Sequence, residues 1–435
     1  MAIKTSPESV TINQLKEENA RLKKSVQELV TINELARIIS STMSLEKVLD
    51  RVVASSVKAI DAEQGTIHLL EKMAGGDPFK TLIRKADETT PADKYRLDDV
   101  LSGWMIKHRN PLLINDFSRT KLFKGSRPED EKIKTLLSVP LMCKGGLIGV
   151  LNLFNKKGPG VFSEDDQRLL CIIASQSAQV IENARLYEEE KQLRLFEQEV
   201  EMARAIQHRL LPKEDPKIAG FDVAGVSDSA KEVGGDYFDF IDLGNDRWAI
   251  ALGDISGKGI PASLLMAYLQ ATLGSQVLTT PSLVQCIANT NNILYRNTPS
   301  DKFVTLFCGI LDLSGHSFEY VNAGHNYPFH LNQNGEFSSL ETGGVVLGML
   351  PDCRFEPGKV QLDSGDVLVI YSDGVTEAEN EIEVLFGEAR LQKVMKANRH
   401  LSARQIIEKI FQSIKKFTGP KVQDDDITLI VLKRE

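Results

Sequence analysis

The sequence has few cysteines and no long apolar run, and both absences restrict where the protein can work. Five cysteines occur in 435 residues, an odd number scattered through apolar stretches, which argues against a disulfide framework or a zinc site. They are Cys143, Cys171, Cys286, Cys308 and Cys353. No window approaches the roughly 20 uncharged apolar residues of a membrane span, and the N-terminus lacks a signal-peptide pattern. We therefore expect a reduced, cytoplasmic protein.

An excess of basic residues is also missing. Lys and Arg total 52 against 60 Asp and Glu, which gives a formal net charge of −8. Binding to nucleic acid or to an anionic membrane needs a basic face, so we expect neither partner. An acidic chain can still bind cations. The length and the ordinary proportions of 42% apolar and 26% charged residues predict two or three globular domains.

Two segments have the heptad spacing of apolar residues that is typical of coiled coils. In the first, Asn19 occupies a seam position, where a buried amide fixes the register of a parallel two-stranded coil. This seam consists of Ile12, Leu15, Asn19, Leu22, Val26, Leu29, Asn33 and Ala36. The second consists of Leu186, Leu193, Phe196, Val200, Ala203 and Leu210, and Pro212 ends it. We expect a parallel homodimer held by both segments. For the first, a single amphipathic helix lying on the next domain is the alternative.

Residues 41–185 alternate between helix and strand patterns. Helical periodicity covers residues 44–60 and the segment after Ser163, and strand-like runs lie between them. The strand pair "SVPLMCKGGLIGVLNLFNKK" has a predicted turn at Gly145 and Gly146. With its entry helix, antiparallel sheet and exit helix "FSEDDQRLLCIIASQSAQVIENARL", the segment resembles a GAF domain. That resemblance implies a small-molecule sensor or a dimerisation module.

Part of this segment is similar to the signature of GAF domains that bind cyclic nucleotides. The matching residues are Asn155, Lys156, Phe162 and Asp166. Gln167 stands where the signature has a glutamate, so the match is incomplete. We favour a structural interpretation, a Lys-Lys turn followed by Ser163 as the N-cap of a helix. A small-molecule ligand at the GAF domain is the other interpretation.

The C-terminal half places two aspartates at the open end of a predicted hairpin. Strand patterns at 236–242 and 247–253 flank the turn sequence "LGND". Asp236 and Asp254 are equally distant from the middle of this turn, near Asn245, so antiparallel pairing brings their carboxylates together. Carboxylates this close repel one another unless a cation lies between them.

Two further strand patterns contribute more acids. Asp373 follows the apolar run Val367 to Tyr371, and the acidic triplet 424–426 precedes the strand pattern 427–432. Taken alone, the triplet is best interpreted as a solvated acidic turn. If the two strands pair antiparallel, however, the triplet meets Asp373. Four acidic sites at one end of a core, without clustered histidines or cysteines, favour a hard divalent cation such as Mg²⁺ or Mn²⁺.

Five ordered motifs now point to a family. "VGGDYFDF", "GDISGKGIPASLLMA", "NAGHNYP", "YSDGVTEA" and "DDDITLIVL" resemble the SpoIIE-like branch of the PPM metal-dependent serine/threonine protein phosphatases, over about residues 200–434. The resemblance implies an α-β-β-α sandwich with two Mn²⁺ or Mg²⁺ ions at one end of its sheets. Carried over by motif, the metal ligands are Asp236, Asp254, Asp373, the backbone carbonyl of Ile255, and Asp425 or, as second choice, Asp426.

The resemblance also implies a mechanism and a substrate. Asp236, Asp254 and Asp373 would be the catalytic ligands, and the two cations would activate a bridging water for in-line attack on a phosphoserine or phosphothreonine. The substrate would be a phosphoprotein such as an anti-sigma-factor antagonist. Eukaryotic-type members have a histidine where this chain has Ser256, so the general acid has no assignment.

Three residues near the motifs have a structural interpretation beside a functional one. His325 is a candidate acid, but a structural imidazole in a Gly-rich turn is preferred. Lys231 is either a phosphate anchor or a solvated lysine. Lys258 lies between glycines whose spacing does not fit a P-loop.

The predicted architecture is an α+β multidomain chain. It comprises an N-terminal coiled-coil helix (1–40), a GAF domain with an antiparallel sheet (41–185), a helical coiled-coil linker (186–212) and a PPM phosphatase sandwich (213–435). The predicted function is a GAF-regulated, metal-dependent serine/threonine protein phosphatase. Two other classes match part of the pattern: a catalytically inactive signalling scaffold, against which the four acidic sites argue, and a metal-dependent phosphodiesterase.

Overall fold

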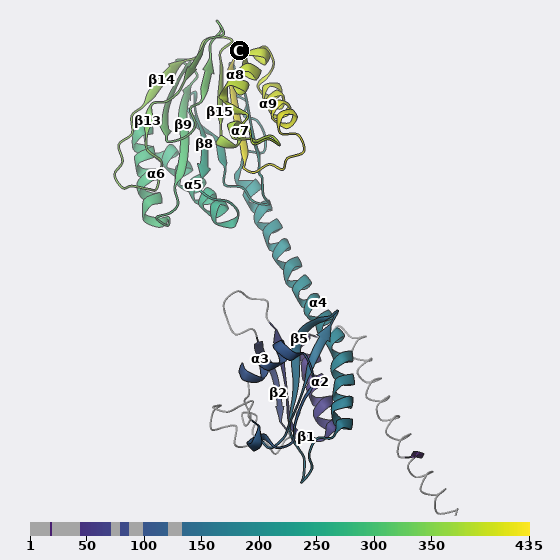
Figure 1. Ribbon diagram of the computed structural model, residues 1–435. Helices are drawn as coiled ribbons and strands as arrows, with labels where there is room; N and C mark the ends of the chain where they lie inside the picture. Colours follow the sequence, from purple (N-terminus) through teal and green to yellow (C-terminus); the bar gives the residue numbers. More distant parts are fainter. Residues whose placement is uncertain (1–17, 20–43, 71–78, 87–98, 121–132) are drawn as a thin grey trace, which may run out of the picture. The chain divides into compact units, whose positions relative to one another are not determined.

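The computed structural model describes residues 18–19, 44–70, 79–86, 99–120 and 133–435 (Figure 1). These residues belong to two units, Met1–Arg194 and Leu195–Glu435. The coiled coil predicted for residues 1–40 lies outside the described residues, apart from Glu18 and Asn19. Among the described helices, none combines the length and the apolar character that crossing a bilayer requires.

The first unit is built on a sheet with strand order β2-β1-β5-β4-β3, in which all neighbouring strands are antiparallel. The strands are β1 (Ala62–Leu70), β2 (Phe79–Ala86), β3 (Leu112–Ile114), β4 (Leu136–Cys143) and β5 (Gly146–Lys156). The helices are α2 (Leu45–Ile60), α3 (Asp99–His108), the short 3-10 helix η1 (Phe117–Arg119) and the first part of α4 (Glu164–Leu210).

Helices α2 and α4 cover this sheet because their apolar residues recur every three or four positions. Val52 and Val53 of α2 and Ile173 and Ala174 of α4 share one buried cluster with Leu151 of β5. The helix predicted for residues 186–211 continues the GAF exit helix as expected, because α4 runs without a break from Glu164 to Leu210.

The β4–β5 hairpin turns one residue earlier than expected. Cys143 pairs with Gly146, so the two turn residues are Lys144 and Gly145, and not Gly145 and Gly146. Both have a left-handed backbone, with φ of 48° and 80°, as the tight turns that match the twist of β-strands require. A left-handed backbone is modestly unfavourable for lysine and easy for glycine. The prediction therefore placed the turn at the two glycines, one position too late.

Two of the GAF signature residues, Lys156 and Asp166, contribute to the start of helix α4. The Ser163 hydroxyl accepts a hydrogen bond from the Asp166 backbone N–H at 3.1 Å, and the Asp166 carboxylate accepts one from the Ser163 backbone N–H at 2.8 Å. Lys156 also forms an ion pair with Asp166, with 3.0 Å between Nζ and Oδ1. These contacts fix the start of α4, as the structural interpretation predicted.

The second unit contains two sheets. The first has strand order β13-β10-β9-β8-β7, with β14 also paired to β10, and the second has β12-β11-β15-β16-β6. Their strands are β6 (Phe221–Asp228), β7 (Tyr237–Gly244), β8 (Arg247–Ile255), β9 (Val304–Asp312), β10 (Ser317–Ala323), β11 (Phe329–Leu331), β12 (Phe337–Ser339), β13 (Gly343–Gly344), β14 (Gly358–Gln361), β15 (Val367–Tyr371) and β16 (Ile427–Arg434). The helices are α5 (Ile260–Thr279), α6 (Leu283–Asn297), α7 (Asp373–Thr376), α8 (Gly387–Asn398) and α9 (Ala403–Thr418).

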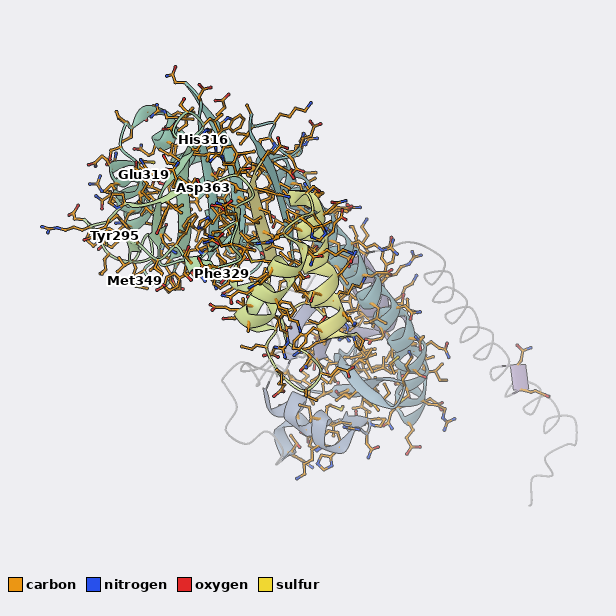
Figure 2. The ribbon with its side chains drawn as sticks, turned by 90° about the horizontal axis from the view of Figure 1, so that it is seen from above. Tyr295, His316, Glu319, Phe329, Met349 and Asp363 are labelled. Atoms are coloured by element: carbon orange, nitrogen blue, oxygen red, sulfur yellow. The ribbon has the colours of Figure 1, made fainter. Side chains whose placement is uncertain are left out.

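These elements form the four layers that were expected. Helices α5 and α6 pack on the outer face of the first sheet, and α8 and α9 pack on the outer face of the second. In Figure 2, Tyr295 of α6 lies on the opposite side of the sheets from the yellow helices α8 and α9. The two inner faces meet in one apolar cluster that includes Leu252, Phe307, Ile370 and Leu432. The α-β-β-α sandwich places the ends of β8, β15 and β16 where the acidic motifs lie.

Candidate metal centre

Two of the predicted acids meet at the open end of the β7–β8 hairpin. Tyr237 pairs with Gly253 in antiparallel register, so one step further along Asp236 lies opposite Asp254. The arrangement agrees with the equal spacing of the two aspartates from the turn, although the strand ends differ from the expected ones by one or two residues.

Asp236 is the most deeply buried of these acids. Its side chain is 4% exposed, and burial, followed by the charge of Asp254, raises its pKa well above the usual range of a carboxyl group. The hydroxyls of Thr428 and Ser372 lower this pKa in part. One of its oxygens, Oδ2, has no hydrogen-bond partner in the described part of the chain. An ionised carboxylate in this position is costly unless a cation approaches the free oxygen.

Asp373 enters the same end from the second sheet. β15 and β16 pair antiparallel, with Tyr371 opposite Leu429, so Asp373 lies beside the start of β16 as predicted. Burial raises the pKa of Asp254 to about 7, and the charges of Asp373 and Asp425 add to the shift. Burial, followed by the charges of Glu377 and Asp425, raises the pKa of Asp373 to about 6. Acids from both sheets therefore destabilise one another's ionised forms, as carboxylates around a cation site do.

The contacts within the acidic triplet favour Asp425 over Asp426 as a ligand. The carboxylate of Asp426 accepts hydrogen bonds from the backbone N–H groups of Ala230 at 2.8 Å, Gly235 at 2.6 Å and Asp236 at 3.3 Å. It therefore holds the loop that leads into β7. Asp425 forms an ion pair with Lys258 at 2.9 Å, and an ion pair with a flexible lysine can exchange for one with a metal.

Two glycines allow this loop to approach the site. A Cβ atom on Gly234 would lie 2.6 Å from Oδ2 of Asp426, and one on Gly235 would lie 3.2 Å from the backbone oxygen of Ile255. Larger residues at either position would push the loop away from the acids. The "VGGD" motif thus brings Asp236 and the carbonyl of Ile255, the predicted backbone ligand, close together.

The donor set fits a hard divalent cation. It consists of carboxylates and a backbone carbonyl, the oxygen ligands that Mg²⁺ and Mn²⁺ prefer, and it includes the unpartnered oxygen of Asp236. Within the described residues, no three acidic, histidine or cysteine side chains already converge on one point as a complete ligand set. The Lys258–Asp425 ion pair at 2.9 Å offsets part of the repulsion among these carboxylates.

Ser256 and His325 have structural contacts. The Ser256 hydroxyl accepts a hydrogen bond from the backbone N–H of Phe303 at 2.9 Å, which ties the loop after Asp254 to the start of β9. His325 is 3% exposed, and its Nδ1 lies 2.8 Å from the hydroxyl of Thr305. Burial lowers the pKa of His325 to about 4, so this imidazole is neutral near pH 7 and is a poor proton donor. Lys231 is exposed, in the loop that Asp426 holds.

Sequence reasoning missed Gln207, near the end of α4. Its side chain is 7% exposed and makes two hydrogen bonds with one residue of the loop. Nε2 donates to the backbone oxygen of Gly234 at 2.6 Å, and Oε1 accepts from the backbone N–H of Gly234 at 3.1 Å. Gly234 is two residues from Asp236, so α4 contacts the loop that positions the most buried acid. A glutamine in a charged helical segment carries no sequence signal of such a role.

Comparison with known proteins gives two family matches. Residues 244–435 match the model of the family described as Stage II sporulation protein E (SpoIIE), and residues 42–182 match the model of the GAF domain. The SiaA-PP2C domain of Pseudomonas aeruginosa has the same fold, with a TM-score of 0.51 and 17% identity over 56% of this chain and 98% of that domain.

Two curated relatives are similar in sequence. The phosphoserine phosphatase RsbU of Bacillus subtilis is 33% identical over 254 residues, which cover 57% of this chain and 75% of RsbU. The protein IcfG of Synechocystis is 30% identical over 264 residues, which cover 54% of this chain and 41% of IcfG. The ordered acidic motifs, the four-layered sandwich and this similarity agree, and the chain therefore belongs to the SpoIIE-type family of PP2C-like serine/threonine protein phosphatases, with a GAF domain preceding the phosphatase domain.

Proposed function

We propose that the chain removes phosphate from a phosphoserine or phosphothreonine of a partner protein, such as an anti-sigma-factor antagonist, and that its GAF domain regulates this activity. The observation that carries the proposal is the buried Asp236, which has an oxygen without a hydrogen-bond partner in the described part of the chain and whose pKa is raised by burial and by acids from both sheets. Similarity to RsbU, a phosphoserine phosphatase, supports the substrate class.

The proposed ligands are Asp236, Asp254, Asp373, Asp425 and the backbone carbonyl of Ile255. Two bound Mn²⁺ or Mg²⁺ ions would supply a water molecule of lowered pKa and positive charge for the phosphate oxygens. Asp426, the second choice for a ligand, is instead proposed to hold the loop, since its carboxylate already accepts three backbone hydrogen bonds.

Lys258, Ser256 and His325 are proposed to position the ligands rather than to bind the metal. Lys258 holds Asp425 and also donates to the backbone oxygen of Asp424 at 2.6 Å. If Asp425 held a cation instead, the ammonium group of Lys258 would be free to pair with a phosphate oxygen of the substrate. Ser256 fixes the backbone that presents the Ile255 carbonyl. His325 is proposed to be structural, since its Nδ1 lies 2.8 Å from the hydroxyl of Thr305 in β9.

Regulation is proposed to pass through α4, and the active protein is proposed to be a parallel homodimer. In the single chain, large apolar residues of α4 are exposed: Leu186, Tyr187, Leu193, Leu195, Phe196, Met202 and Ile206, each at 47–69%. Exposed apolar residues at this density are costly in water, and pairing with the same segment of a second copy would bury them. A cytoplasmic location is part of the proposal, consistent with the five free cysteines.

The activity can be tested with purified protein and Mn²⁺. We expect hydrolysis of p-nitrophenyl phosphate and of a phosphoserine peptide, and no hydrolysis of bis-p-nitrophenyl phosphate, which would indicate a phosphodiesterase. Asp373→Asn should lower turnover at least a hundredfold, whereas Asp242→Asn, an exposed position on β7, should leave it unchanged. Turnover by Asp373→Asn within tenfold of the wild type would refute the assignment.

A further inference from the structure

A cavity of about 660 Å³ lies beside the metal centre in the second unit. Gly374, Lys258 and Asp425 form part of its wall, so the cavity borders the proposed ligand Asp425 and the residue that follows Asp373. The rest of the wall comes from the end of α9, the segment that follows it and the residues after α7. This volume lies within the range of pockets that hold ligands much larger than a phosphate group.

The cavity has an apolar side. Phe411 and Ile414 of α9 line it, together with Ile427 at the start of β16 and Val422. Ile414 and Ile427 are each 4% exposed and belong to the core, while Phe411 is half-buried and Val422 is 79% exposed. The exposed Val422 would be covered by an aliphatic side chain that entered the cavity, which is a favourable contact in water.

The cavity also has an acidic side. Its wall contains five carboxylates and three lysines. The carboxylates belong to Asp228, Glu377, Glu379, Asp424 and Asp425, and the lysines are Lys258, Lys415 and Lys421. Lys421 binds Glu379 at 2.5 Å, and Lys258 binds Asp425. In the described part of the chain, neither Asp228 nor Glu377 has a basic side chain within ion-pair distance. A basic group next to an aliphatic one would therefore complement this wall.

We propose that this cavity is the docking groove for the segment of the partner protein that flanks its phosphorylated residue. The segment would place an aliphatic side chain against Val422 and Phe411 and a lysine or arginine near Asp228. The inference rests on the proposed function, because only a protein substrate has a flanking segment to dock. It makes the groove, and not the metal centre, the part that selects among phosphoproteins.

The test compares substrates that reach the groove with one that does not. Two phosphoserine peptides would carry Lys and Leu within four residues of the phosphoserine, before it in one and after it in the other. Matched peptides would carry Glu and Gly instead, and p-nitrophenyl phosphate would serve as the small substrate. We expect kcat/KM of the wild type to be at least tenfold higher for one Lys-Leu peptide than for its matched Glu-Gly peptide.

Variants then locate this preference. Val422→Asp should lower the ratio of kcat/KM for the preferred peptide to that for p-nitrophenyl phosphate about tenfold, and Asp228→Lys should shift preference towards a Glu-Leu peptide. Leu278→Asp is the matched control, because Leu278 is 62% exposed near the far end of α5 and should leave the ratio unchanged.

Two results would overturn the groove. They are a wild-type enzyme that hydrolyses all peptides equally well, and a Val422→Asp variant that keeps the wild-type ratio. A wild type that hydrolyses p-nitrophenyl phosphate but does not distinguish the peptides refutes the groove alone. A Mn²⁺-loaded wild type that hydrolyses none of these substrates refutes the proposed function as well.

Discussion

Replacing Gln207 should weaken the metal centre although this residue is not a ligand. In Gln207→Ala, both hydrogen bonds to Gly234 are lost, and the backbone N–H and carbonyl of Gly234 are left without these partners. Each such bond contributes roughly 0.5–1.5 kcal/mol, so the ordered loop loses about 1–3 kcal/mol. If this whole amount is coupled to metal binding, the apparent Kd for Mn²⁺ rises about 5- to 150-fold.

Isothermal titration calorimetry with Mn²⁺ measures this change directly. Activity at low Mn²⁺ should fall in parallel and recover at saturating Mn²⁺, because excess metal favours the ordered loop. Gln198→Ala is the control, since Gln198 is exposed on the same helix. Gln207→Glu adds a second readout. A protonated glutamic acid can both donate to and accept from Gly234, whereas the ionised form cannot donate, so its activity relative to wild type should improve as the pH falls.

A Kd for Mn²⁺ in Gln207→Ala within twofold of the wild type, with an unchanged circular dichroism spectrum, would refute this reasoning. It would mean that Asp426 and the two glycines hold the loop without help from α4, and α4 would then have no established route to the metal centre.

Three further predictions concern the acids and the helix. Asp254→Asn should stabilise the metal-free protein more at pH 8 than at pH 5, because a carboxyl whose folded pKa is about 7 opposes folding once the pH exceeds its unfolded pKa. The full effect above pH 7 is at most roughly 4 kcal/mol, and urea unfolding in EDTA that shows the same gain at both pH values would contradict it. Lys258→Met should tighten Mn²⁺ binding severalfold in calorimetry, since the lysine competes for Asp425, with Lys231→Met as the control; weaker binding would show that Lys258 supports the ligands. Inserting four residues after Glu190 shifts the phase of α4 by about 40° and should change the phosphatase activity, whereas inserting seven residues nearly restores the phase. Equal activity of both insertion variants and the wild type would show that α4 is a passive stalk.

The positions of the acids were predictable because they follow from strand periodicity. Asp236 and Asp254 are equidistant from one turn, and the short turn together with the alternation of apolar residues fixes the register of the two strands. The pairing of β15 with β16 follows from a different pattern. Each strand is a continuous apolar run, which is typical of a strand inside a sheet.

The contacts that distinguish similar residues were not predictable. Asp425 and Asp426 are adjacent and chemically identical, and only the path of the loop before β7 decides which carboxylate accepts the backbone N–H groups. The Gln207–Gly234 contact joins residues 27 positions apart through the end of a helix, and the groove combines side chains of α9 with residues more than 150 positions away. Such contacts depend on tertiary packing, which has no local period.

The place of β16 in its sheet has a consequence for synthesis. β16 lies between β15 and β6, and among the described strands β6 is paired with β16 alone. A ribosome adds about 5–20 residues per second, so roughly ten to forty seconds pass between the synthesis of β6 and that of its partner β16. During this interval the first unit can fold, but the sheet that carries Asp373 and Asp425 is incomplete. A nascent chain can therefore fold its GAF domain before the sheet that carries Asp373 and Asp425 is complete.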